Sequence, residues 1–234
     1  MSFLDDVKEN QTLQIQVICV ALFLIAFPSY FFMKAAATDN PTGMGGVGTY
    51  TVDADFTYIE LASASQDIAD GETFSLDLNT MDLSTEDKEK NIVGVLVSLS
   101  YSENEESTAG CVSGDAADTI TGTVTHLEYT NSGDGQNSGG SGSHDVSTEW
   151  YNTSVIGDKI EGLSESEISE RLESNGAGLG DYTVEITVDA NTGGNTPPVL
   201  CQRSDNGENV TYSVKLIVLD YSITPYVDLD DIDV

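Results

Sequence analysis

The feature that most constrains this chain is a continuous apolar run near its N-terminus. Residues 15–33 read IQVICVALFLIAFPSYFFM and carry no ionised side chain. A helix of that length, at a rise of ~1.5 Å per residue, extends roughly 28 Å, which matches the hydrocarbon thickness of a bilayer. Because lipid offers no hydrogen-bond partners, a helix that satisfies its own backbone groups suits this environment. We therefore expect a transmembrane helix over residues 15–34.

A cleaved signal peptide is the main alternative for this run. Signal peptides combine a basic N-terminal region, an apolar stretch of about 7–15 residues and a small-residue cleavage site. Ala35, Ala36 and Ala37 offer such a site, but residues 1–14 are net negative and the apolar run is longer than that. We favour a retained anchor over a signal peptide, and both over a buried soluble helix.

The anchor divides the chain into five segments. Lys8 and Lys34 flank it one on each side, so basic residues do not decide the orientation. The bulk of the chain is rich in Thr, Ser, Gly and Asp, which favours placing it outside the cell in a single-pass cell-membrane protein. The expected segments are a cytoplasmic tail (1–14), the transmembrane helix (15–34), a Gly/Pro-rich tether (35–48), a folded ectodomain (49–227) and an acidic tail (228–234).

The ectodomain shows the residue patterns of an all-β protein. Apolar residues alternate with polar ones from Tyr50 to Tyr58, which is typical of a half-buried strand. Six further runs rich in Val, Ile, Thr and Tyr predict strands: Thr73–Leu78, Ile92–Tyr101, Thr119–Tyr129, Asp145–Tyr151, Tyr182–Val188 and Val210–Tyr221. These patterns predict an immunoglobulin-like β-sandwich of about seven strands with one short helix.

The short helix is predicted after Leu163. Ser164 is followed three residues later by Glu167, the spacing of a capping box, and Asn175–Gly176 can end the helix. Residues 84–90 are either a helical turn or a loop. Residues 131–143 (NSGDGQNSGGSGS) have no apolar anchor, so we expect a mobile loop there.

The charge of the chain excludes several classes of partner. Eight Lys and Arg residues face 40 Asp and Glu residues, giving a formal net charge of −32. Nucleic acids are excluded because they are bound through clustered Lys and Arg, and docking on anionic lipid surfaces is disfavoured. Such acidity suits a salty environment, where ions screen the self-repulsion.

Two cysteines outside the apolar run predict a disulfide. Cys111 and Cys201 lie in turn-rich stretches, and an oxidising compartment favours their pairing. That bond would bring the loop with Asp115 and Asp118 close to the loop with Asp205 and Glu208. Converging carboxylates suggest a calcium site; the alternative is that these are ordinary acidic turns.

No catalytic motif occurs in the chain, so we predict that it is not an enzyme. His126 and His144 have no nucleophile arranged around them, and phosphate-cradling and zinc-binding motifs are missing from the sequence. Asn152 and Asn209 lie in N-x-[ST] sequons and are candidate glycosylation sites.

Two resemblances to known proteins bear on function. The segments GDYTVEITVDANTGG and SDNGENVTYSVKLIVLDYS, within roughly residues 180–221, resemble the terminal strand pair of uncharacterised membrane-anchored β-sandwich proteins of marine archaea. This resemblance implies a location at the cell surface. The order of an apolar helix and then a β-sandwich is also similar to archaeal type IV pilins and archaellum stator proteins. Unlike the basic leader of pilins, residues 1–14 contain no Lys/Arg-Gly cleavage site and carry the acids Asp5, Asp6 and Glu9 before the apolar run.

Three functions follow as expectations. The first is a membrane-anchored surface protein with a structural or interaction role, whose partner is a protein, a glycan or the surface layer. The second is a filament or motor-associated subunit. The third is a calcium-dependent adhesion or binding module.

Overall fold

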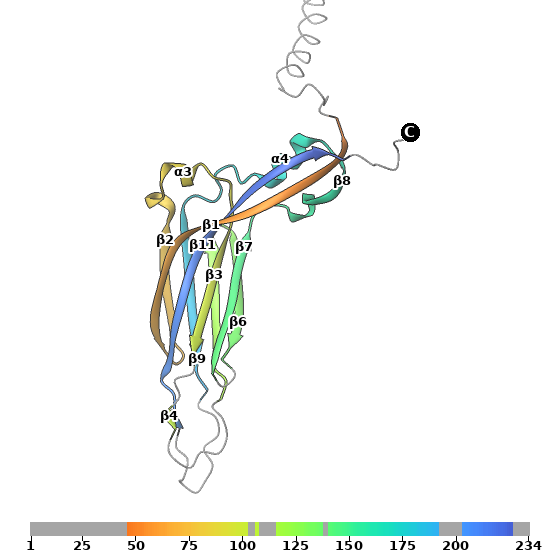
Figure 1. The fold of residues 1–234 in the computed structure, drawn as a ribbon. Helices are drawn as coiled ribbons and strands as arrows, with labels where there is room; N and C mark the ends of the chain where they lie inside the picture. The colour runs from red at the N-terminus through yellow and green to blue at the C-terminus, as the bar shows by residue number, and fades with distance from the viewer. Residues whose placement is uncertain (1–45, 103–105, 108–115, 138–139, 192–202, 227–234) are drawn as a thin grey trace, which may run out of the picture.

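The structure is a computed structural model that describes residues 46–102, 106–107, 116–137, 140–191 and 203–226. Within these residues the chain is mostly strand, arranged in two antiparallel sheets with few helices (Figure 1). The predicted all-β sandwich is therefore confirmed at the level of fold class. The segments 1–14, 15–34 and 228–234 lie outside the described residues.

The two main sheets contain five and four strands. The five-stranded sheet has the order β7-β3-β11-β1-β8 and consists of β1 (Gly48–Ala69), β3 (Ile92–Ser102), β7 (Ser141–Glu149), β8 (Gly157–Leu163) and β11 (Gly207–Pro225). The four-stranded sheet has the order β2-β9-β5-β6 and consists of β2 (Thr73–Asn79), β5 (Thr119–His126), β6 (Tyr129–Gln136) and β9 (Asp181–Asp189). A separate short pair joins β4 (Glu106–Ser107) to β10 (Arg203–Ser204).

Two long strands, β1 and β11, run side by side in the five-stranded sheet. β1 and β11 pair from Tyr50 opposite Pro225 to Ala69 opposite Gly207, with one irregularity between Glu60 and Ala62 (Figure 1). The sequence predicts β1 only as far as Tyr58. Ile59 and Leu61 still follow, but from Ala62 to Ser65 Ala and Ser replace the larger residues, so the strand continues without a strong hydrophobic pattern.

Each long strand contributes to two separate hydrophobic cores. On β11, Leu216 and Val218 belong to the core between the two sheets, whereas Ile217 and Leu219 belong to a second core. All four residues are buried, which explains why this run lacks alternation.

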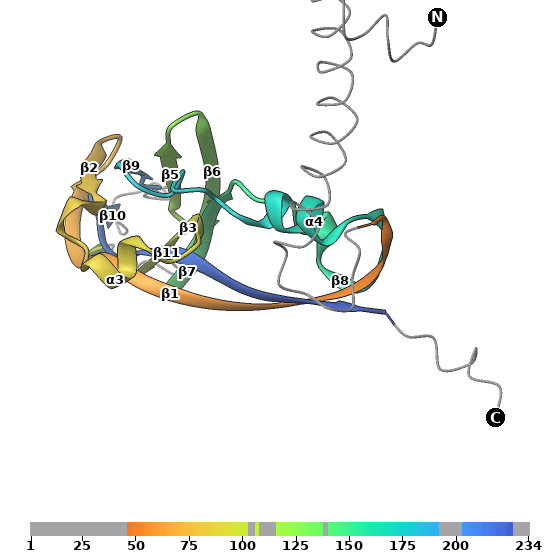
Figure 2. The same ribbon diagram turned by 90° about the horizontal axis from the view of Figure 1, so that it is seen from above.

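The second core lies beneath a small lobe formed by residues 150–176 (Figure 2). The lobe consists of the 3₁₀ turn η2 (Thr153–Val155), β8 and α4 (Glu165–Leu172). The predicted capping box is present, because Ser164 Oγ accepts from the Glu167 amide while the Glu167 carboxylate accepts from the Ser164 amide. Ile168 and Leu172 are the buried residues of the helix, as their spacing predicts.

Two further short helical segments connect β2 to β3. They are η1 (Thr80–Asp82) and α3 (Thr85–Lys88), so residues 84–90 include a helical turn. After α4 the chain turns at Asn175 and Gly176, whose φ angles are +50° and +83°.

The predicted mobile loop over residues 131–143 is wrong. Most of this run belongs to β6, in the four-stranded sheet, and to β7, the next strand along the chain, in the five-stranded sheet. Gly135 packs so close to the His144 ring and the Tyr101 hydroxyl that a Cβ would overlap them. The glycines, which suggested flexibility, are the residues that permit this close approach.

The predicted strand Thr119–Tyr129 also differs from the structure. β5 ends at His126, and the chain reverses at Leu127, which has a φ angle of +51°. Trp150 directly follows β7, is partly buried, and donates from its indole nitrogen to the Ile92 carbonyl at 2.9 Å.

Candidate functional site

Three of the four predicted calcium-ligating carboxylates meet at the end of the sandwich far from the lobe. Asp118 directly precedes β5, Asp205 lies between β10 and β11, and Glu208 is the second residue of β11. One carboxylate oxygen from each lies within 4.8 Å of the others. The fourth predicted residue, Asp115, lies outside the described residues.

Two of these carboxylates are buried and share one amide. Asp118 and Glu208 are 0% and 1% exposed. The Asn137 side-chain amide donates to Asp118 Oδ2 at 2.9 Å and to Glu208 Oε1 at 3.2 Å. The Asn191 backbone amide donates to Asp118 Oδ1 at 2.6 Å. Neutral donors compensate part of the hydration that a buried carboxylate loses.

Asn137 is a residue of this cluster that the sequence did not indicate. It is fully buried and directly follows β6, in the run expected to be a loop. Its side-chain oxygen also accepts from the Asp118 amide at 2.8 Å. Nothing in the surrounding DGQNSGG distinguishes this asparagine from a turn residue, so only the fold places it.

The carboxylates have the chemistry of a hard-cation site. Calcium takes roughly six to eight oxygen ligands in irregular geometry, from carboxylates, backbone carbonyls and water. Asp118, Asp205 and Glu208 would supply three of these ligands. Arg203, which is also buried, precedes Asp205 by two residues and carries positive charge into the same loop.

The chain next to the two cysteines is paired in the structure. β4 and β10 are antiparallel, with Arg203 opposite Ser107 and Ser204 opposite Glu106. Cys201 precedes this pair by two residues and Cys111 follows it by four. Both cysteines lie outside the described residues, so the disulfide stays a prediction that this pairing favours.

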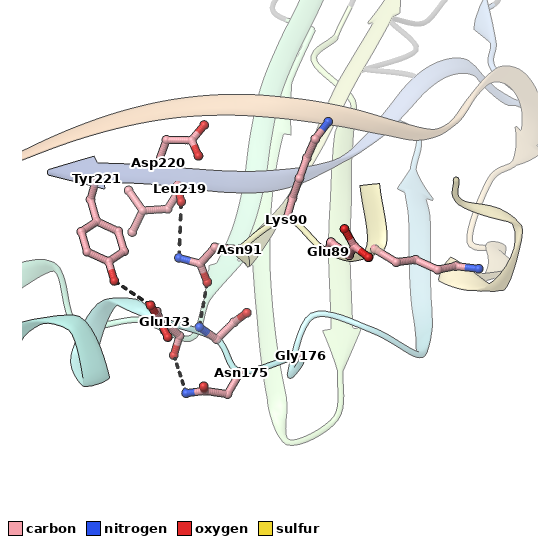
Figure 3. A pocket seen from close by; sticks show the side chains of 11 residues that line it. Glu89, Lys90, Asn91, Glu173, Asn175, Gly176, Leu219, Asp220 and Tyr221 are labelled. Atoms are coloured by element: carbon pink, nitrogen blue, oxygen red, sulfur yellow. Dashed lines mark hydrogen bonds between the residues drawn. The ribbon is translucent and has the colours of Figure 1, made fainter. Parts of the chain in front are cut away.

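A polar hollow of about 570 Å³ lies where the lobe joins the sheet (Figure 3). Its lining comes from the end of α3 and the chain that leads to β3, from the chain after α4, and from β11. Tyr221 donates from its hydroxyl to Glu173 Oε1 at 2.8 Å across the hollow, and burial raises the pKa of this tyrosine.

Asn91 holds this junction together. Its side-chain amide donates to the Leu172 carbonyl at 3.0 Å and to the Leu219 carbonyl at 3.3 Å. Its side-chain oxygen accepts from the Ser174 amide at 2.8 Å (Figure 3). Leu172 ends α4, where carbonyls lack helical partners, so Asn91 caps the helix and ties it to β11.

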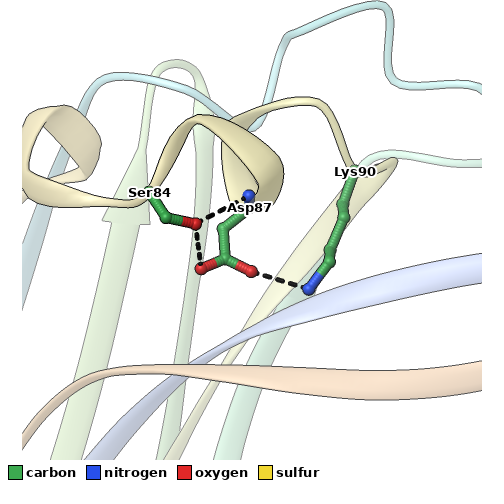
Figure 4. A network of polar contacts seen from close by, with 3 residues as sticks. All are labelled: Ser84, Asp87 and Lys90. Carbon is green, nitrogen blue, oxygen red and sulfur yellow. Dashed lines mark hydrogen bonds and ion pairs between the residues drawn. The ribbon is translucent and has the colours of Figure 1, made fainter.

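Two lysines near this hollow are already engaged with the chain. Lys90 Nζ lies 2.6 Å from Asp87 Oδ1, and Ser84 Oγ donates to the same carboxylate at 2.7 Å (Figure 4). The contact lowers the pKa of Asp87 and raises the pKa of Lys90. Lys88 Nζ donates to the Met81 carbonyl at 2.6 Å. These contacts give both lysines a structural role.

The ring nitrogens of both histidines lie within hydrogen-bond distance of backbone carbonyls or a hydroxyl of the fold. The ring nitrogens of buried His126 lie 2.8 Å from the Asp181 carbonyl and 2.6 Å from the Ala177 carbonyl, and its ring stacks on Tyr182. His144 lies 3.3 Å from the Tyr101 hydroxyl and 3.2 Å from the Gly133 carbonyl.

The two predicted glycosylation asparagines are exposed. Asn152 is the N-cap of η2, and its side-chain oxygen accepts from the Ser154 amide at 3.0 Å. Asn209 lies on β11, and its side-chain amide donates to Asp67 Oδ1 at 2.6 Å. Exposure is necessary for glycosylation, which stays a prediction.

No protein-family model and no curated protein matches this sequence. Within the described ranges, no helix is both long and apolar enough to cross a bilayer. The apolar run of residues 15–33 precedes those ranges.

Proposed function

We propose that this chain is a single-span membrane protein that displays an acidic β-sandwich outside the cell, where the sandwich has a structural or interaction role. The anchor is the apolar run within residues 15–34, and residues 35–48 tether the sandwich to it. The partner lies in the envelope and is a protein or the surface layer.

The observation that carries this proposal is the placement of the two ends of the described domain. Gly48 and Pro225, where β1 begins and β11 ends, lie at the same end of the molecule, and the Tyr226 amide donates to the Thr49 carbonyl at 3.0 Å (Figure 1). Glu208 pairs with Ile68 near the other end of β1. At ~3.3 Å per residue, the acidic cluster lies about 65 Å of strand away from the tether.

The charge of the domain supports display in an aqueous, salty setting. Two ion pairs among the described side chains, Lys90 with Asp87 and Lys159 with Glu161, are both at the surface. Unpaired surface carboxylates remain hydrated, and salt reduces their repulsion.

Extraction of native membranes tests the anchor. The protein should stay in the membrane fraction after alkaline carbonate washing, and the mass of its N-terminal peptide should include residues 1–14. Release by carbonate, or an N-terminus that begins near Ala37, would contradict a retained anchor. Loss of residues 1–14 together with recovery in filaments would favour the filament subunit instead.

A second candidate, a calcium-dependent binding module, is favoured by the convergence of Asp118, Asp205 and Glu208 within 4.8 Å. We expect calcium to raise the melting temperature of the full chain, and Asp205→Asn to reduce that increase. Asp77→Asn, a change of an exposed acid on β2, is the matched control. A melting temperature that calcium does not change, with no heat in a calorimetric titration, would exclude this function.

A further inference from the structure

β1 has a long edge that carries no neighbouring strand in the described part of the chain. β11 pairs with one side of β1 along its length, whereas β8 pairs with the other side only between Gly48 and Val52. From Asp53 to Ala69 no described strand lies along that second side. At ~3.3 Å per residue this open edge measures roughly 55 Å. Figure 2 shows β1 along the outer margin of the sandwich.

Two hydrogen bonds identify which backbone groups face the open side. The Tyr226 amide donates to the Thr49 carbonyl at 3.0 Å, so the backbone groups of Thr49 point toward β11. Successive residues of a strand point to opposite sides in the plane of the sheet. The backbone groups of Ala54, Phe56 and Tyr58 therefore point outward, as do those of Glu60.

The alternation reverses after the irregularity between Glu60 and Ala62. The Asp70 amide donates to the Asn206 carbonyl at 3.1 Å, so even-numbered residues now face β11. The backbone groups of Ser63 and Ser65 therefore point outward. At Asp67 the outward carbonyl accepts from the Gln66 side chain at 2.9 Å, which closes the edge there.

The side chains of this edge are acidic and partly aromatic. β1 contains Asp53, Asp55, Glu60 and Asp67, all exposed, and no Lys, Arg or His. Phe56 and Tyr58 are 37% and 54% exposed. An added strand would therefore place alternate side chains against carboxylates and aromatic rings.

The charge decides between two possible occupants. Pairing β1 with β1 of a second copy would bring four acids on each strand together, between chains that each carry a net charge of −32. Like charges opposite one another destabilise a strand pair, and charged edges are a common protection against self-association. A strand that carries Lys or Arg is attracted by the same carboxylates.

We propose that the outer edge of β1, from Ala54 to Ser65, binds an extended basic segment of a partner protein by strand addition. This inference rests on the proposed interaction role and specifies the class of partner. Backbone hydrogen bonds supply the affinity, and basic and apolar side chains at alternate positions of the added segment supply the specificity.

The test uses the purified full chain in detergent and a synthetic ten-residue peptide in which lysine alternates with threonine and valine. The control peptide has the same sequence but is N-methylated at two adjacent central residues, so that neither of its edges can pair. Amide hydrogen exchange is measured residue by residue. At a peptide concentration about ten times its Kd, exchange at the outward amides of Phe56, Tyr58, Ser63 and Ser65 should slow roughly tenfold.

The alternation separates strand addition from simple charge attraction. The inward amides of Asp55 and Ala64 should keep their exchange rates, and the N-methylated peptide should give no protection. Uniform protection, equal protection by both peptides, or no protection would overturn the proposal. Protection that rises with protein concentration in the absence of peptide would identify a second copy as the occupant and also overturn it.

A matched pair of variants provides a second test. Ser63→Pro removes an outward amide without removing a bond to β11, so it should lower peptide affinity at least tenfold, whereas Ser63→Ala should not change it. Equal affinity of the two variants would contradict strand addition. Failure of either experiment leaves the membrane anchor unaffected, because carbonate extraction tests that separately.

Discussion

Asn91→Ala should loosen the attachment of the lobe to the sheet. The side chain of Asn91 forms three hydrogen bonds to backbone groups: to the carbonyls of Leu172 and Leu219 and from the amide of Ser174. Alanine removes all three and leaves these groups to find other partners. The lobe would then be held mainly by its hydrophobic core, which includes Ile168 and Leu172.

The expected loss can be worked from these contacts. A net contribution of about 1 kcal/mol per hydrogen bond gives a total of about 3 kcal/mol. The hollow beside Asn91 is open to solvent, so water can satisfy part of the released groups, and we expect about 2–3 kcal/mol. For a domain of this size the melting temperature should fall by roughly 4–12 °C.

Thermal unfolding of the full chain, combined with hydrogen exchange, measures this effect. Exchange in α4 should accelerate more in Asn91→Ala than exchange in β9. Asn209→Ala is the matched control, because Asn209 is exposed and donates one bond to Asp67, so its cost should stay below about 1 kcal/mol. Equal losses in the two variants, or a loss in Asn91→Ala that spares α4, would refute the assignment of Asn91 as the tie between lobe and sheet.

Two other changes test the packing and the helix cap. Gly135→Ala should destabilise the fold by about 1–3 kcal/mol in chemical denaturation, because its Cβ would overlap the His144 ring, whereas Gly140→Ala meets no neighbour within 4 Å and should be nearly neutral. The hydrogen bonds from Ser164 hold the pKa of Glu167 below its ordinary value of 4.5. The ionised carboxylate therefore stabilises the fold above pH ~4.5, and this stabilisation is lost as the pH falls through the lowered pKa. Glu167→Gln should therefore flatten the acid limb of unfolding free energy against pH, and a curve identical to that of the Glu170→Gln control would contradict the capping role.

The parts of the fold that the sequence predicted are those whose local residue pattern is compatible with only one kind of secondary structure. The runs Ile92–Tyr101 and Val210–Tyr221 are rich in the Val, Ile and Tyr residues that strands prefer, and the structure has β3 and β11 there. The helix was found from a local hydrogen-bonding pattern, Ser164 with Glu167, which needs no knowledge of distant residues.

The parts that were missed depend on contacts between distant residues. Gly135 reads as flexible in the sequence, yet it belongs to a strand because the rings of Tyr101 and His144 fill the space above it. β8 (GDKIEGL) has no alternating pattern and forms because the start of β1 offers it an edge. Propensity alone does not include these tertiary contacts.

The sequence likewise predicted some residues of the candidate sites and missed others. We predicted from the sequence, through an inferred disulfide, that Asp118, Asp205 and Glu208 lie close together. The structure places them together at the starts of β5 and β11. Asn137, which joins two of these carboxylates, was missed because its role depends on the pairing of β6 with β5, which places it opposite Asp118. Asn91 was missed because a single asparagine between two elements has no sequence signature.

Protease treatment of intact cells that express the full chain tests the central proposal most directly. If the sandwich is displayed outside, peptides from residues 46–226 should disappear from the cell-associated protein, and peptides from residues 1–14 should remain until the membrane is permeabilised. Cytoplasmic marker proteins must stay intact throughout. Survival of residues 46–226 in intact cells, with cleavage only after permeabilisation, would contradict display at the cell surface.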